Sequence, residues 1–309
     1  MLPWAQEIDA LAEQRDFAGV VAVDRGGHTE FSKAYGLADR ASQVPNTVRT
    51  RFGIASGTKG LTALAVVSLI SDGALSRSTT ARSVLGQDLP LIGADVPVEH
   101  LLAHRSGIGD YLDEQDGYQV TDYVLTVPAQ ELTSTEAYLA VLGGHPAKFR
   151  AGERFCYCNS GYVVLALIAE RVGGVPFPQL VRDRVCRPAG LDDTGFLRSD
   201  ELPGRTAIGY LPIEGSSRTN VFHLPVMGSG DGGIYSTAAT SAPCGDRCSR
   251  TGSCRPDGSP SSCSLAATCP LSRCGTASAS GSIGTPARCC WREWTPASHS
   301  GACITRSPP

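Results

Sequence analysis

The chain has 309 residues, of which 41% are hydrophobic and 18% charged, with a net charge of −3 and a pI near 6.1. This length can bury a large core, and the acidic balance excludes the basic excess that is typical of a nucleic-acid-binding protein. No apolar run is long enough for a transmembrane helix, and the first residues lack the basic and apolar regions of a signal peptide, so we expect a cytoplasmic protein.

The first quarter of the chain predicts a helix, two strands and a second helix. Residues 4–15 have apolar side chains at helical spacing, which predicts an amphipathic helix. Residues 17–24 and 28–36 are rich in β-forming side chains around a Gly-Gly turn at 26–27, which predicts a hairpin whose first strand is buried. Residues 61–70 are apolar on nearly every side and are followed by Gly73, which predicts a buried helix with a glycine stop.

Helical patterns dominate the middle of the chain, and strands return after it. Helices are predicted over 98–103, 134–142, 162–172 and 177–185, and strands over 206–210 and 233–235. The order favours an α+β fold in which an antiparallel sheet is flanked by helices. We predict a discontinuous sheet lobe from residues 1–75 and 205–238, and a mainly helical lobe from residues 76–204.

Residues 239–309 have a different composition. They contain nine of the twelve cysteines, are rich in Ser, Pro and Gly, and show no helical or strand periodicity. A segment so poor in core-forming side chains is predicted to be disordered or non-native. Three hypotheses are a zinc module, which the absence of a Cys-x2-Cys pair disfavours, a disordered tail, and a segment translated out of frame. The third is favoured because 24 arginines against three lysines suggest G+C-rich codons.

Ser56 and Lys59 form a Ser-x-x-Lys pair at the start of the predicted buried helix. Side chains at positions i and i+3 share one face of a helix, so the hydroxyl and the amine are expected to meet. Burial lowers the pKa of a lysine, and a neutral amine can take the serine proton. The helix dipole and the Ser56 N–H would favour an anion at this end of the helix, as in one half of an oxyanion hole. On its own this spacing is weak evidence, and its position directly before a predicted buried helix strengthens it.

Tyr157 and Asn159 are the second candidate pair. Two residues apart in an extended segment, they are expected to point the same way. A phenol beside an ammonium has a lowered pKa and can transfer protons, and an amide can hold a substrate carbonyl. The alternative is an aromatic side chain of the core, with Cys156 and Cys158 as small packed thiols.

Taken together, these motifs resemble the serine hydrolases of the class C β-lactamase and penicillin-binding-protein group, which includes D-alanyl-D-alanine carboxypeptidases and β-lactamase-like esterases. The strings 100–107, 149–153, 159–162 and 230–237 add to the similarity, which covers residues 5–238. The resemblance implies the β-lactamase/transpeptidase-like fold and an acyl-enzyme on a small ester or amide. It implies that Ser56 is the nucleophile, that Lys59 and Tyr157 share the acid and base work, and that Asn159 positions the substrate. An ester, a β-lactam or a D-alanyl peptide would each fit.

The chain departs from this family in its third motif, a Lys/His-x-Gly strand beside the site. His299-Ser300-Gly301 matches it in letters only, within the aberrant tail. The run 289–303 can be encoded so that an adjacent frame resembles the closing strands of the family, without Lys or His, which would suit an ester. Without those strands the sheet would be incomplete, and the alternative function is a catalytically impaired or non-catalytic protein of the same fold.

We expect no cofactor and no metal. His100 and His104 lie at i and i+4, as metal ligands on a helix do, but no third ligand is near in sequence, and a helix end before a Ser-Gly turn is the favoured interpretation. The sequence leaves the oligomeric state open.

Overall fold

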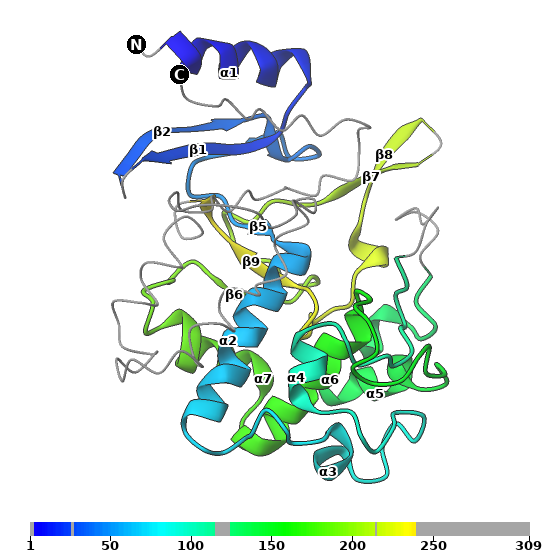
Figure 1. Cartoon of the computed structure of the whole chain (residues 1–309). Helices are drawn as coiled ribbons and strands as arrows, with labels where there is room; N and C mark the ends of the chain where they lie inside the picture. Colours follow the sequence, from blue (N-terminus) through cyan, green and yellow to red (C-terminus); the bar gives the residue numbers. More distant parts are fainter. Residues whose placement is uncertain (1–2, 26–27, 115–123, 214, 239–309) are drawn as a thin grey trace.

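The first layer of the molecule is a helix lying on a two-stranded ribbon (Figure 1). In the computed structural model, which describes residues 3–25, 28–114, 124–213 and 215–238, helix α1 (Pro3–Gln14) packs on strands β1 (Gly19–Arg25) and β2 (His28–Tyr35). The two strands pair antiparallel, with Gly19 opposite Tyr35. Trp4 meets Phe31 edge to face, and Asp9 accepts hydrogen bonds from Lys33 and Tyr35, so α1 is fixed to β2 by apolar and polar contacts.

Short strands connect this layer to the helices. β3 (Leu37–Asp39) pairs with β4 (Val44–Pro45), and β7 (Tyr210–Ile213) pairs with β8 (Ser216–Thr219). The third group is a three-stranded antiparallel sheet in the order β5 (Phe52–Gly53), β9 (Ile234–Ser236), β6 (Gly195–Phe196). Because β9 lies between two strands from distant parts of the sequence, it joins both ends of the described chain into one fold.

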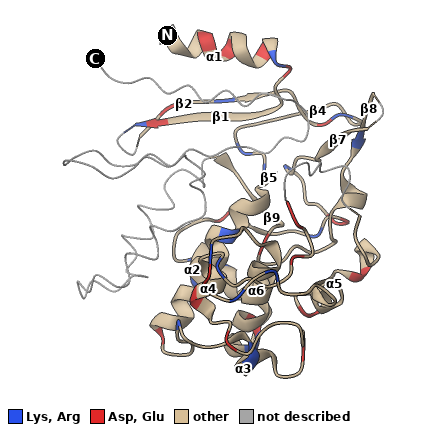
Figure 2. Cartoon of the chain, turned by 45° about the vertical axis from the view of Figure 1, so that its right-hand side comes forward, with Lys and Arg blue, Asp and Glu red and all other residues tan. Residues whose placement is uncertain are grey.

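Two apolar helices form the core. α6 (Asn159–Gly173) lies among α2 (Thr58–Ser71), α3 (Ala81–Leu85), α4 (Val98–Leu102) and α7 (Phe177–Val181), and it contacts all four (Figure 1). Eleven consecutive residues of α6, from Asn159 to Ala169, are buried. An apolar helix without a polar face requires such surroundings. Figure 2 shows α2 and α6 as mostly uncharged, and Lys59 is the single charged residue of α2.

Shorter helical turns complete the described structure: α5 (Leu139–Leu142), the 3-10 turns Ala55–Gly57, Ala129–Glu131, Glu136–Tyr138 and Val221–His223, and a π-helical turn over Arg182–Cys186 that continues α7. In the described part of the chain no single helix has the length and apolarity to cross a membrane. Only α6 together with Phe177–Cys186, a pair bent by 82°, meets the length and composition criteria.

Most predicted elements are confirmed, with shifted ends. The helix predicted over 61–70 begins at Thr58, and the one predicted over 162–172 begins at Asn159, so Asn159 is helical rather than extended. The helix predicted over 134–142 is a 3-10 turn followed by a short α-helix. The strand predicted over 206–210 is wrong for most of its length. Thr206 makes one isolated bridge to Arg51, and the strand begins at Tyr210, where β8 offers a partner.

The α+β class is confirmed. The division into two lobes stays a prediction, and so does the incompleteness of the sheet. The predictions for the turn at 26–27 and for residues 239–309, including the out-of-frame hypothesis and His299, lie outside the described residues.

Candidate active site

Ser56 lies at a sharp turn between a strand and a helix. β5 ends at Gly53, a 3-10 turn covers Ala55–Gly57, and α2 follows at once. Ala55 has a φ of 43°, in the left-handed region, which for a residue with a Cβ is unfavourable by about 1–3 kcal/mol. The neighbouring Ile54 N–H donates to the Ile234 carbonyl of β9, which holds the turn in place. The turn leaves Ser56 exposed while Thr58 and Lys59 are buried.

The Lys59 amine lies within hydrogen-bond distance of the Ser56 hydroxyl. Its Nζ is 3.1 Å from Ser56 Oγ, 2.8 Å from Asn159 Oδ1 and 2.8 Å from the backbone oxygen of Asp231. Lys59 is 1% exposed. Burial lowers its pKa from 10.5, against the opposing effect of the carboxylates of Asp231, Glu114 and Asp110.

These contacts define which way a neutral amine would point. Two of the three neighbours of Nζ are carbonyl oxygens, which can only accept hydrogen bonds. They use the two N–H bonds of a neutral amine, and its lone pair is then directed at the third neighbour, the Ser56 hydroxyl. The geometry therefore suits proton transfer from Ser56 to Lys59.

Tyr157 approaches Ser56 from the other side. Its hydroxyl donates to Ser56 Oγ at 2.8 Å, and its ring lies 4.9 Å from Lys59 Nζ. The expectation of a lowered pKa is wrong. Burial raises the pKa of Tyr157, and the carboxylates of Glu114 and Asp231 raise it further, although the hydrogen bond to Ser56 lowers it. Tyr157 is therefore a neutral phenol that donates a proton, because a buried phenolate beside carboxylates is disfavoured.

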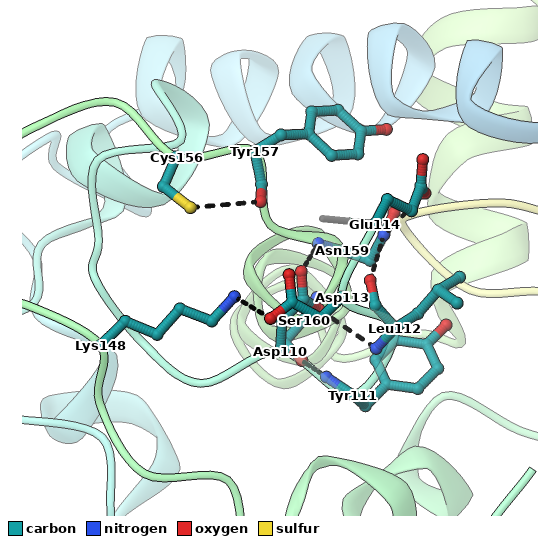
Figure 3. A network of polar contacts seen from close by, with 10 residues as sticks. All are labelled: Asp110, Tyr111, Leu112, Asp113, Glu114, Lys148, Cys156, Tyr157, Asn159 and Ser160. Atoms are coloured by element: carbon teal, nitrogen blue, oxygen red, sulfur yellow. Dashed lines mark hydrogen bonds and ion pairs between the residues drawn. The ribbon is translucent and has the colours of Figure 1, made fainter. Parts of the chain in front are cut away.

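Asn159 faces Lys59 rather than open solvent. Its Oδ1 accepts from Lys59, and its Nδ2 donates to the Leu112 carbonyl at 2.8 Å and to Glu114 at 3.0 Å (Figure 3). The side chain is 2% exposed, and all its N–H bonds have protein partners. The arrangement orients Lys59. Its role in substrate binding stays a prediction, since a substrate carbonyl would have to displace one of these partners.

Asp110 caps the helix that begins at Asn159. The residue before the helix, Cys158, makes no side-chain cap. Instead Asp110, from a distant loop, accepts from the backbone N–H groups of Asn159 and Ser160 at 2.8 and 2.9 Å (Figure 3). Acidic groups are favoured at a helix N-terminus because its N–H groups have no partner within the helix. Burial nevertheless raises the pKa of Asp110, since its hydrogen bonds offset only part of the desolvation.

Three residues of this network, Asp110, Tyr111 and Glu114, were not expected from the sequence, and Asp231 was expected only as part of the family-like string 230–237. Asp231 is buried, and its carboxylate accepts from the Tyr111 hydroxyl at 2.6 Å while its backbone oxygen accepts from Lys59. The Asp110-Tyr111 pair begins three residues after Gly107, which ends the Ser-Gly turn of the family-like string 100–107. An acidic residue three positions after that turn was the available clue.

In the described part of the chain, Ser56, Lys59 and Tyr157 belong to no metal cluster and lie apart from the cavity beside Ser160. The described residues contain no group of three or more His, Cys, Asp or Glu side chains that could hold a metal ion. A cavity of about 280 Å³ lies beside Ser160 and is lined mainly by apolar side chains such as Leu91, Ile92 and Val164. Ser56, Lys59 and Tyr157 do not line it, so it is separate from the candidate site.

The chain is similar to a known protein family, to curated relatives and to solved structures. A family profile described as Beta-lactamase matches residues 4–243. Esterase EstB of Burkholderia gladioli is 32% identical over 216 residues, which cover 65% of this chain and 52% of that protein. The crystal structure of a penicillin binding protein from Bacillus halodurans has a TM-score of 0.73 at 36% identity, covering 79% of this chain and 74% of that one.

A further solved structure is the D-amino acid amidase from Ochrobactrum anthropi SV3 complexed with L-phenylalanine amide, with a TM-score of 0.62 at 26% identity over 76% of this chain and 66% of that one. The chain spans about half the length of the curated relatives it matches. The matched residues include all the described elements except the first residue of α1, and they include Ser56, Lys59, Tyr157 and Asn159.

Proposed function

The chain belongs to the Beta-lactamase family and has its β-lactamase/transpeptidase-like α+β fold, and from this we propose that it is a serine hydrolase that forms an acyl-enzyme at Ser56 on a small ester or amide. The observation that carries the proposal is an exposed hydroxyl held between a buried amine at 3.1 Å and a neutral phenol at 2.8 Å. Relatives named as a penicillin-binding protein, an esterase and an amidase support the reaction class.

The first step is attack by Ser56 on the substrate carbonyl. As the Oγ–carbon bond forms, the hydroxyl proton passes to the lone pair of neutral Lys59. When the tetrahedral intermediate collapses, the bond to the leaving oxygen or nitrogen breaks and that atom takes a proton. Tyr157, whose hydroxyl is 2.8 Å from Ser56 Oγ, supplies it, and the Tyr157 oxygen takes in exchange the proton that Lys59 received from Ser56, so that both groups end neutral. A water molecule then attacks the acyl carbonyl and gives a proton to neutral Lys59; the Ser56 Oγ–carbon bond breaks, and Oγ takes that proton back as the acid is released.

The charges around Lys59 favour an uncharged acyl group. The side chains of Asp231, Glu114 and Asp110 lie close enough to raise the pKa of Lys59, and all three are acidic. When Lys59 is neutral, as the attack requires, Lys148 still lowers the pKa of Asp110, but it is ion-paired with Asp113 at 2.6 Å, so the carboxylates are only partly compensated. A substrate carboxylate, such as that of a β-lactam, would be repelled. We therefore propose a neutral carboxylic ester as the substrate class, in line with the esterase relative.

Covalent labelling tests the reaction. The wild-type chain is incubated with a fluorophosphonate, which forms an Oγ–phosphorus bond and releases fluoride. We expect one adduct, located by peptide mass spectrometry at Ser56. Ser56→Ala should give none, and Ser42→Ala, at an exposed turn serine, should label at the wild-type rate. Labelling at another serine, or equal labelling of Ser56→Ala, would refute the proposal.

A matched pair of substrates tests the ester class. p-Nitrophenyl acetate and p-nitrophenyl succinate share a leaving group and differ in a carboxylate on the acyl side. We expect kcat/KM to be at least about tenfold higher for the acetate, which corresponds to about 1.4 kcal/mol of repulsion. A preference for the succinate, or faster acylation by a fluorescent penicillin, would contradict the electrostatic argument.

The alternative is a protein of this fold that acylates slowly or not at all. Its support is the composition of residues 239–309, which offer no Lys/His-x-Gly strand pattern to supply a second oxyanion donor. Removing one such donor lowers turnover by about a hundred- to a thousandfold. Labelling of wild-type Ser56 without ester turnover would favour this alternative.

A further inference from the structure

One residue contacts all three members of the tripeptide that contains Tyr157. The backbone oxygen of His104 accepts from the N–H of Cys156 at 2.8 Å, and its Nδ1 accepts from the N–H of Cys158 at 3.1 Å. Between these two hydrogen bonds, its ring stacks on the ring of Tyr157, with centroids 4.6 Å apart and planes inclined by 29°. His104 thus fixes the backbone on both sides of Tyr157 and the face of its ring.

His104 is itself held rigidly. It is 2% exposed, and its ring also lies against Tyr162 of the buried helix α6 at 4.9 Å. Its backbone is in the left-handed region, with φ at 54°, a conformation that persists only where the surroundings enforce it. An Nδ1 that accepts a hydrogen bond carries no proton, so the ring is neutral. Burial lowers the pKa of His104 to about 4, and the nearby Lys59 lowers it in the same direction.

Residues 105–107, which follow His104, form further backbone hydrogen bonds with the segment that leads to Tyr157. The Arg105 carbonyl accepts from Gly152 N–H and the Gly107 carbonyl accepts from Lys148 N–H, both at 2.8 Å. The segment 148–158 is therefore aligned along the 104–107 turn. No regular strand or helix supports Tyr157, since it lies between Cys156 and the N-cap Cys158 in an extended connection. The contacts of His104 hold Tyr157 in place of a helix or strand.

We propose that His104 is a positioning residue for Tyr157, which holds the phenol hydroxyl over Ser56 by stacking on its ring and by accepting from the following N–H. His104 does not touch the reacting atoms and acts through Tyr157. The kinetic part of this inference rests on the proposed function, whereas the placement of Tyr157 does not.

Three variants separate the contacts. His104→Phe retains a ring and loses the acceptor, His104→Asn retains a side-chain acceptor and loses the ring, and His104→Ala loses both. The backbone contact to Cys156 is retained in each. We expect the rate constant for fluorophosphonate labelling of Ser56 to fall about tenfold in the Phe and Asn variants and about a hundredfold in the Ala variant, with KM for an ester changed less than about twofold.

A double-mutant cycle distinguishes positioning from general destabilisation. If His104 acts through Tyr157, then adding His104→Ala to Tyr157→Phe should lower the labelling rate by less than about threefold. An additional loss as large as in the wild-type background would overturn the proposal. His223→Ala is the control histidine variant. His223 is half-buried, its Nδ1 has no hydrogen-bond partner among the described residues, and it lies in the 3-10 turn Val221–His223, so the variant should label at the wild-type rate.

Crystal structures of the Phe and Asn variants provide a readout that needs no activity. We expect the distance from Tyr157 hydroxyl to Ser56 Oγ, 2.8 Å in the wild-type structure, to exceed 3.5 Å in both. An unchanged distance in both variants would overturn the proposal even if their rates fall. Should the wild-type protein fail to label, the proposed function would be refuted, and these distances would still decide the role of His104.

Discussion

The neutral, buried ring of His104 makes the stability of the protein depend on pH. The pKa of His104 is lowered from 6.5 to about 4 in the folded protein, because burial and Lys59 disfavour the charged ring. The unfolded chain binds this proton near pH 6.5. Between the two pKa values the unfolded state therefore binds more protons, so stability is complete above pH 6.5 and is lost as the pH falls towards 4.

The magnitude follows from the size of the shift. A pKa difference of about 2.5 units corresponds to a contribution of ~3 kcal/mol to the free energy of unfolding, at ~1.4 kcal/mol per unit. Typical domains are stable by only ~5–15 kcal/mol, so the loss should be easy to measure. By this linkage about three fifths of the contribution is lost at pH 5 and about nine tenths at pH 4.

Urea unfolding from pH 4 to pH 7.5, for wild type and His104→Phe, isolates this contribution. The carboxyls of Asp110 and Asp231 have raised pKa values and act in the opposite direction, but they are present in both proteins and cancel in the difference. We expect the stability difference between the two proteins to change by ~3 kcal/mol in favour of the variant as the pH falls from 7 to 4. A difference independent of pH would refute a neutral, buried His104.

Three more predictions concern the site and its support. The rate of Ser56 labelling should rise with pH as Lys59 loses its proton. Because burial lowers the pKa of Lys59, the rate should level off below pH 10.5. A rate that still rises at pH 10.5 would contradict this prediction. Asp110→Ala should lower the free energy of unfolding by ~2–4 kcal/mol, because two buried N–H groups of α6 lose a charged acceptor. The measurement is urea unfolding, and a loss below ~1 kcal/mol would show that the cap is unimportant. Gly230→Ala should destabilise by at least ~2 kcal/mol because its Cβ would overlap the Tyr162 carbonyl, whereas Gly204→Ala, which has open space around it, should melt within a few degrees of wild type.

The periodicity of the sequence predicted the long elements well and the short ones poorly. The helices at Thr58–Ser71 and Asn159–Gly173 are nearly continuous apolar runs, and such runs leave few alternatives to a buried helix. Strands of two or three residues, such as Phe52–Gly53 and Ile234–Ser236, have no periodicity to detect. They exist because tertiary contacts bring their edges together.

The sequence predicted that Ser56 and Lys59 meet, but it did not predict the direction in which the pKa of Tyr157 is shifted. Spacing along one helix suffices to predict that Ser56 and Lys59 meet, and the geometry agrees. The pKa of Tyr157 could not be predicted, because its direction depends on burial and on carboxylates from Glu114 and Asp231, which lie far from it in sequence. For the same reason the cap by Asp110 and the contacts of His104 became visible only in three dimensions.

The burial of Lys59 has a practical consequence for chemical modification of this protein. The chain contains three lysines, and the side chains of Lys33 and Lys148 are 48% and 21% exposed, each in an ion pair. Lys59 is 1% exposed behind its three acceptors. Succinimidyl ester dyes or biotin should therefore attach at Lys33 first, on the ribbon under α1. Such labelling would leave the Lys59 amine and its contact with Ser56 unmodified.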